Sequence, residues 1–261
     1  MLEIKDVRVL YPNGTEALKS VTFSASKGEL IAIVGRSGAG KSTLLRCING
    51  LQPVASGKIV LDQDEITAMT DTRLNMVRRQ IGFIWQEYNL IDRSSAMRNV
   101  LTGRLGYSRG FGSFIGYFGR ADREIAVQSF ERVNLLHRAG HRADRLSGGE
   151  KQRVSIARAM TQQPKLILAD EPVASLDPGL AWQVLADLAK VSREDNVLTI
   201  INLHQIELAR EFCDRIIGIA QGSVVFDGKP DELDQPALDH IYHFDRPIST
   251  LTATKRAEVL N

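Results

Sequence analysis

Two glycine-rich stretches have residue types and a spacing that suit anion binding. "GRSGAGKS", Gly35 to Ser42, satisfies the pattern G-x-x-x-x-G-K-[ST] between an apolar run and a helix-like segment. "LSGGEKQR", Leu146 to Arg153, starts with a serine that can cap a helix and two glycines that let a ligand approach the main chain. The first stretch alone accounts for a phosphate site, so the ligand of the second stretch needs its own explanation.

The first stretch predicts a nucleoside triphosphate site. Its glycines permit a tight loop whose N–H groups point at phosphate oxygens, and the following helix adds its N-terminal dipole. Lys41 supplies a positive charge for the β- and γ-phosphates, and the Ser42 hydroxyl is a ligand for Mg²⁺. We expect the nucleotide to contact Gly35, Arg36, Ser37, Gly38, Ala39, Gly40, Lys41, Ser42 and Thr43.

Two acidic residues end the apolar run "KLILADEP". Asp170, at the tip of a buried parallel strand, can hold the water shell of Mg²⁺. Pro172 favours an extended conformation at Glu171, which aims that carboxylate away from the metal and towards an attacking water, as a general base requires. Asp177 and Pro178 are good N-cap and N1 residues for the next helix.

Short apolar runs that alternate with amphipathic segments position these residues, which indicates an α/β fold. "LIAIV", "LILA" and "LTII" are apolar throughout, as strands covered on both faces are. Turn-rich flanks at three further strands, "LEIKDVRVL", "SVTFSA" and "KIVLD", indicate an antiparallel layer at one edge. The remaining expected strands are "IGFIWQ", "RIIGIA" and "SVVFDG".

The strand signal disappears between Asn89 and Gln163, where "REIAVQSFERVNLL" and "GGEKQRVSIARAMTQQ" space their apolar residues helically. This predicts a helical lobe inserted in the sheet domain. We expect one domain over residues 1–228, with the lobe at about 89–163, and a short polar tail over 229–261.

Composition excludes several classes of protein. The chain has 261 residues, of which 43% are hydrophobic and 25% charged, and a net charge of +2 that gives no reason to expect nucleic acid binding. Cys47 and Cys213 have no metal-binding spacing, and the first residues resemble a strand more than a signal peptide. No apolar run approaches the roughly 18 residues of a spanning helix. We therefore expect a cytosolic protein that reaches a membrane only through a partner.

The order of the motifs resembles that of the ATP-binding cassette ATPases: phosphate loop, "WQ", "LSGGE", "LILADE", "SLD" and a histidine after "TIIN". The resemblance covers about Met1 to Gly228 and implies a P-loop NTPase (RecA-like) core with an antiparallel β layer and an inserted α-helical lobe. It also implies a role for three side chains. Tyr11 would stack on adenine, Gln86 would contact Mg²⁺ or the attacking water, and His204 would touch the γ-phosphate.

Taken alone, Gln86 is an ordinary polar residue at a strand end and a lone histidine such as His204 is more often a structural hydrogen-bonding group. Glu150 stands where many family members carry glutamine, and we expect function to survive because both residues form helices well.

The resemblance also explains the second anion site. In this family two cassettes pack head to tail, and the signature helix of one completes the ATP site of the other. Ser147, Gly148 and Gly149 are therefore expected to contact the nucleotide of a second copy of the chain. Loss of the γ-phosphate would remove the contact and open the dimer.

Three segments, "NVLTGRLGY", "LADEPVASLDP" and "NLHQIELAREFCDRIIGIAQGSVVFDG", are most similar to the ATP-binding subunits of phosphonate importers. That implies permease partners, an indirect solute-binding protein, and a place on the cytoplasmic face of the plasma membrane. Importers of phosphite, phosphate or amino acids are the alternatives. A non-transport cassette ATPase is a further one, although such proteins commonly have long coiled-coil insertions or two cassettes.

One stretch has two interpretations. Gly103 to Arg120 mixes glycines with aromatic residues that include Phe111, Phe114 and Phe118. It either folds back on its own lobe or contributes to the groove that receives the permease, because clustered exposed aromatics mark interfaces.

Overall fold

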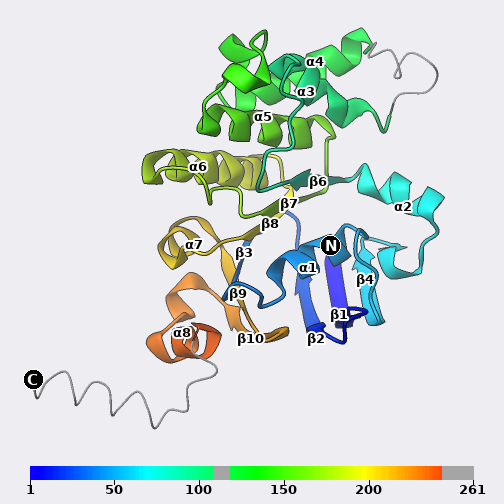
Figure 1. Cartoon of the computed structure of the whole chain (residues 1–261), viewed down its shortest axis with the longest axis vertical. Helices are drawn as coiled ribbons and strands as arrows, with labels where there is room; N and C mark the ends of the chain where they lie inside the picture. The colour runs from blue at the N-terminus through cyan, green and yellow to red at the C-terminus, as the bar shows by residue number, and fades with distance from the viewer. Residues whose placement is uncertain (108–117, 243–261) are drawn as a thin grey trace, which may run out of the picture.

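The computed structural model describes residues 1–107 and 118–242. Within these residues one sheet has four strands, β1 (Leu2–Leu10), β2 (Glu16–Ala25), β4 (Ser56–Leu61) and β5 (Asp64–Glu65). A second sheet has six, β3 (Leu30–Val34), β6 (Ile81–Ile84), β7 (Leu166–Asp170), β8 (Leu198–Asn202), β9 (Arg215–Ala220) and β10 (Ser223–Gly228). The helical lobe lies at one end of the molecule and the four-stranded sheet at the other (Figure 1).

The strand order in the six-stranded sheet is β10-β9-β3-β8-β7-β6. All neighbours in it pair in parallel except β10, which is antiparallel to β9. Every residue of β3, β7 and β8 is buried, which confirms the expectation from their continuous apolar runs. The pairing β2-β1-β4 is antiparallel, as the turn-rich flanks predict, whereas the two-residue β5 was not expected.

The helices of the core and of the lobe come from different parts of the chain. The core has α1 (Lys41–Ile48), α2 (Asp71–Arg78), α6 (Pro178–Glu194), α7 (Ile206–Phe212) and α8 (Gln235–Tyr242). The lobe, between β6 and β7, has α3 (Ala96–Leu101), α4 (Arg120–Arg132) and α5 (Gly148–Thr161). The fold class predicted from the sequence is therefore confirmed. Of the helices in the described ranges, none combines the length and hydropathy that a bilayer-spanning segment requires.

Two apolar clusters hold the layers together. One lies between the two sheets, where Leu44, Leu45 and Ile48 of α1 pack against residues of both. The other joins the opposite face of the six-stranded sheet to the lobe, and Phe130 of α4 and Val154 of α5 are fully buried in it. Apolar burial at about 25 cal/mol per Å² is the main stabilising contribution here.

Residues 229–242, which the sequence analysis treats as part of a tail, pack on the sheet. The side chain of Ile241 in α8 is buried in the same cluster as the lobe. A Cβ at Gly218 of β9 would lie 2.5 Å from Ile241 Cδ1, so only glycine lets α8 approach this strand.

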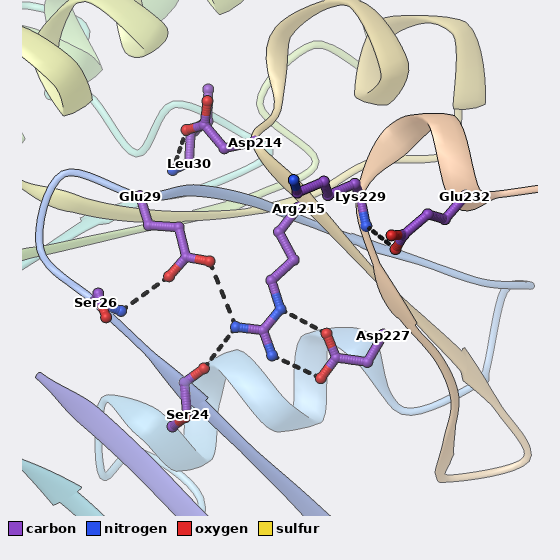
Figure 2. Close-up of polar contacts among 9 residues, drawn as sticks. All are labelled: Ser24, Ser26, Glu29, Leu30, Asp214, Arg215, Asp227, Lys229 and Glu232. Atoms are coloured by element: carbon purple, nitrogen blue, oxygen red, sulfur yellow. Dashed lines mark hydrogen bonds and ion pairs between the residues drawn. The ribbon is translucent and has the colours of Figure 1, made fainter.

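Arg215, the first residue of β9, ties the two sheets together (Figure 2). Its guanidinium donates two hydrogen bonds to Asp227 of β10, at 2.5 and 2.7 Å, and a third at 2.8 Å to the carbonyl oxygen of Ser24 in β2. A contact of 3.4 Å reaches Glu29. The hydrogen bonds and charge of Asp227 raise the pKa of Arg215 in spite of partial burial.

We expect Arg215→Met to lower the free energy of unfolding by about 1–3 kcal/mol, because the substitution removes a charged donor and leaves Asp227 without its partner. Arg8→Met is the matched control, since Arg8 pairs with Glu16 where its side chain is 56% exposed and should cost under about 1 kcal/mol. Urea denaturation measures both. Equal losses would show that Arg215 has no special role between the sheets.

Candidate functional site

The glycine-rich loop connects the carboxyl end of β3 to α1. Gly38 and Gly40 have φ values of 79° and 108°, which side-chain-bearing residues rarely adopt. A Cβ at Gly40 would lie 2.5 Å from the carbonyl oxygen of Ala17, whereas at Gly38 no atom lies within 4 Å. The loop therefore presses against β2 at Gly40 and is open at Gly38.

Lys41, the first residue of α1, turns its side chain back over the loop. Nζ donates to the carbonyl oxygens of Gly35 at 2.8 Å and Arg36 at 3.0 Å. The residue is only 4% exposed, and this burial lowers its pKa although the charges of Glu171 and Asp170 oppose the shift. An ammonium group held only by carbonyl oxygens is prepared to accept an anion.

Asp170 brings together the ends of three strands. One carboxylate oxygen, Oδ1, accepts a hydrogen bond from Ser42 Oγ at 2.8 Å and one from Asn202 Nδ2 at 2.7 Å. Register pairing sets Asp170 opposite Asn202 on β8. Sequence analysis missed Asn202, although a polar residue that ends the apolar run "LTIIN" is a signal that could have found it.

Glu171 is hydrogen-bonded to His204, the histidine that the family resemblance assigns to the γ-phosphate. Its Oε1 lies 2.6 Å from His204 Nε2. The expected extended conformation at Glu171 is wrong, because its φ is 51°, in the left-handed region. The restriction imposed by Pro172 disfavours the right-handed helical region and leaves this one open. The left-handed backbone is strained for a side-chain-bearing residue, at about 1–3 kcal/mol, and the His204 contact helps to fix it.

A cavity of about 530 Å³ lies over the loop. It is bordered by Tyr11, whose hydroxyl is 3.2 Å from Thr43 Oγ1, and by Glu171. Other lining residues that the sequence analysis named are Ser37, Gly38, Gly40, Lys41, Ser42 and Thr43. Other lining residues come from β2 and from the connections before it and between β9 and β10: Thr15, Ala17, Lys19, Gln221 and Gly222.

Four more of the predicted contacts lie elsewhere. Arg36 and Ala39 border a separate cavity of about 270 Å³ on another side of the loop. Gly35 takes part through its carbonyl oxygen, which holds Lys41. Gln86 is exposed two residues beyond β6 and does not line the large cavity. The pairing of β6 with β7 ends at Ile84 and Ala169, two residues before Gln86 and Glu171.

The signature residues do not meet the glycine-rich loop of their own chain. Ser147, Gly148 and Gly149 form the start of α5 and are absent from the lining of the large cavity. Ser147 and Glu150 form a capping box, with Glu150 N donating to Ser147 Oγ at 3.3 Å and Ser147 N to Glu150 Oε2 at 2.8 Å.

Glu150, the departure from the common glutamine, has a further partner in Arg138, 2.8 Å away. Burial raises the pKa of Glu150, but the groups of Ser147 and Arg138 lower it by more, so the carboxylate form is favoured. Asp177 caps α6 through Leu180 N at 3.0 Å, which confirms the capping prediction.

Comparison with known families agrees with this geometry. The family model described as ABC transporter matches residues 18–174, which include the loop, the signature and the Asp170–Glu171 pair. The chain belongs to the ABC transporter family. It is therefore an ATP-binding, ATP-hydrolysing subunit. The cavity over the loop is the candidate ATP site of this cassette.

Characterised relatives are similar over most of their length. This cassette is 47% identical over 242 residues to the phosphonates import ATP-binding protein PhnC 3 of Halalkalibacterium halodurans, covering 93% of this chain and 94% of the relative. It is 49% identical over 242 residues to PhnC of Bacillus thuringiensis subsp. konkukian, with the same coverage. The dimeric structure of MJ0796, a bacterial ABC transporter cassette, shares 34% identity with a TM-score of 0.78, covering 88% of this chain and 99% of that one.

The aromatic stretch is only partly described. Phe111 and Phe114 lie outside the described residues. Phe118 is buried in the lobe cluster with Phe130, which favours the fold-back interpretation for that residue. The Tyr107 hydroxyl lies within hydrogen-bonding distance of two carbonyl oxygens, that of Arg79 at 3.0 Å and that of Gln162 at 2.9 Å.

We expect Gly40→Ala and Gly38→Ala to differ in ATP affinity. Gly40→Ala forces a methyl group against the Ala17 carbonyl and should weaken binding more than tenfold. Gly38→Ala carries only the left-handed backbone penalty of about 1 kcal/mol and should weaken binding about tenfold or less. Titration with a fluorescent ATP analogue measures both, with circular dichroism as the folding control. Equal losses would contradict the role of the Ala17 contact.

Proposed function

We propose that this cassette hydrolyses ATP to energise the import of phosphonate through a membrane permease, on the cytoplasmic face of the membrane. The hydrogen bond between Glu171 and His204 at the edge of the cavity carries the hydrolytic part of the proposal. The names of the similar proteins, phosphonates import ATP-binding proteins at 47–49% identity, support the substrate. Phosphite, phosphate and amino acids are the alternatives that a transport assay distinguishes.

ATP binding would follow from the shape and charge of the cavity. The triphosphate would lie along the loop, and Lys41 would exchange its carbonyl partners for the β- and γ-phosphates. Tyr11, at the border of the same cavity, would stack on the adenine ring. These assignments give the triphosphate and the adenine ring partners from this chain.

The donor set of the site suits Mg²⁺. Ser42 and Asp170 present oxygen atoms next to the loop, 2.8 Å apart, and hard cations prefer oxygen ligands. Nowhere in residues 1–107 and 118–242 do three or more His, Cys, Asp or Glu side chains form a metal-binding cluster. Ser42 and Asp170, with Gln86 from the segment after β6, would share Mg²⁺ with the phosphates and water. When bound, the ion neutralises phosphate charge.

Hydrolysis needs a base at the end of the triphosphate. Glu171 is suited to accept a proton from the attacking water, because its carboxylate borders the cavity and is held by His204. His204 has the γ-phosphate as its alternative partner. ATP binding would then move the histidine from Glu171 to the nucleotide and free the carboxylate for the water.

A second copy of the chain would complete each site. The start of α5 has an anion-binding composition but does not line the cavity of its own chain. The existence of a dimeric structure of the MJ0796 cassette supports pairing with a second copy, for which we propose a head-to-tail arrangement. The groove of about 300 Å³ between β6 and α5, bordered by Leu51, Trp85 and Asn89, is where we expect the permease to bind. A solute-binding protein would act indirectly, through the permease.

Glu171→Gln should bind ATP but hydrolyse it slower by about two to four orders of magnitude, the usual contribution of a general base. The same variant should form an ATP-stabilised dimer, seen as a doubling of mass in size-exclusion chromatography with light scattering. A strain in which it replaces the wild-type chain should take up no labelled phosphonate.

Two outcomes would contradict this assignment. Hydrolysis near the wild-type rate would remove Glu171 from the role of base. Normal phosphonate uptake in that strain, with loss of phosphite, phosphate or amino-acid uptake, would keep the ATPase and change the substrate.

Mixed dimers test whether the signature acts on the partner's nucleotide. Lys41→Ala damages the loop, and Gly148→Asp places a negative charge at the signature. With the two changes on different chains, both fall in one composite site and the other stays intact. With both on one chain and a wild-type partner, each damages a different site. Counting nucleotides trapped with a transition-state mimic should give about one per dimer in the first arrangement and about none in the second.

The reverse counts would mean that each chain uses its own signature. Trapping is the readout because steady-state turnover can require both sites even when one is intact. The single-variant dimers, with either change on one chain only, serve as controls and should each retain one site.

A further inference from the structure

Tyr88 lies two residues after Gln86 in the segment that leaves β6, and α5 fixes its backbone. Tyr88 and Asn89 both have a φ of 48°, a costly conformation for consecutive side-chain-bearing residues. Arg158 of α5 donates to the carbonyl oxygen of Tyr88 at 2.8 Å and to that of Asn89 at 2.5 Å. Burial lowers the pKa of Arg158, and no carboxylate pairs with it in the part of the chain that the structure describes. Its hydrogen bonds go to these two carbonyl oxygens and, at 3.2 Å, to Ser155 Oγ in the same helix.

The side chain of Tyr88 reaches a third segment. Its hydroxyl and that of Ser175 share a hydrogen bond of 3.0 Å. Ser175 belongs to the connection from Glu171 to Asp177, the cap of α6. The tyrosine thus links the segment that contains Gln86 to the segment that starts with the proposed base.

The same hydroxyl borders the first turn of α5. A Cβ at Gly148 would lie 3.2 Å from Tyr88 Oη and 3.4 Å from Leu176 Cδ2. Gly148 therefore packs against Tyr88 and against Leu176, the residue next to Ser175. Neither Tyr88 nor Ser175 lines the cavity over the glycine-rich loop.

We propose that Tyr88 is a positioning residue of the ATP cycle, whose hydroxyl, held by Ser175, keeps the first turn of α5 aligned with the connection after Glu171. This inference rests on the proposed function, because that turn of α5 faces the nucleotide of the partner chain. A displacement of the segment after Gln86 would then shift the signature residues of the same chain. That shift would alter the ATP site that these residues complete on the partner chain. Tyr88 acts through these two segments, since it does not line the cavity of its own chain.

The test uses the full chain in the Glu171→Gln background, where ATP holds the dimer together. Tyr88→Phe, Ser175→Ala and the double variant each remove the same hydrogen bond with little change of shape. We expect each single variant to weaken ATP-dependent dimerisation about three- to tenfold, the range for one neutral hydrogen bond. The double variant should weaken it no further, because both changes remove one interaction. Analytical ultracentrifugation measures the dimer dissociation constant, and monomer affinity for an ATP analogue should stay within about twofold.

Ser129→Ala separates positioning from stability. Its hydroxyl accepts a buried hydrogen bond of 3.0 Å from Thr161 inside the lobe, so its loss should lower the melting temperature and leave the dimer constant unchanged. Any of three results would overturn the inference. Tyr88→Phe could dimerise as tightly as its Glu171→Gln parent, the double variant could lose the product of the two single losses, or the monomer could lose affinity for ATP. If the Glu171→Gln parent itself fails to dimerise with ATP, the proposed function is overturned together with this inference.

Discussion

The buried carboxylate of Asp170 is the interaction on which the site depends. A charge that is 6% exposed is costly unless it is hydrogen-bonded, and here Ser42 and Asn202 both donate to the same oxygen. Ser42 lies in the first turn of α1, which follows β3 and the loop, and Asn202 ends β8, while Asp170 ends β7. Satisfying one carboxylate therefore fixes the carboxyl ends of three parallel strands relative to each other, and with them the loop, the base and the histidine.

The elements around this carboxylate could be predicted from sequence because their signals are local. Continuous apolar runs identify β3, β7 and β8, and the glycine spacing identifies the loop whatever the rest of the chain does. What sequence analysis missed depends on partners that are distant in the chain. Asn202 is recognisable only once β8 is known to lie beside β7, and Arg215 only once β2 and β10 are known to flank it. The prediction of an extended backbone at Glu171 is wrong for the same reason, because a local rule about Pro172 does not include the contact with His204.

The division of the molecule into core and lobe explains why the chain has two anion-binding stretches. The loop is fixed to the sheet through β3 and α1, whereas the signature begins a lobe helix whose first turn packs against Tyr88 and Leu176. The two described cavities that border the loop, of about 530 and 270 Å³, do not include Ser147, Gly148 or Gly149. In the proposed function each chain supplies half of two sites, and a γ-phosphate that joins a loop to another chain's signature would couple nucleotide state to dimer contact.

Three residues with left-handed φ values, Glu171, Tyr88 and Asn89, lie between the site and the lobe. His204 contacts the carboxylate of the first, and Arg158 donates to the carbonyl oxygens of the other two. Residues in such strained conformations persist only where their surroundings hold them. Loss of one of these contacts would therefore change the conformation of one segment and leave the rest of the fold intact. In the proposed function ATP would compete for His204, and a permease in the groove would contact Asn89 and Arg158, which both line it. The two ligands would therefore act on neighbouring restraints of one strained region, and that arrangement lets a small change at either surface reach the other without disturbing the sheet.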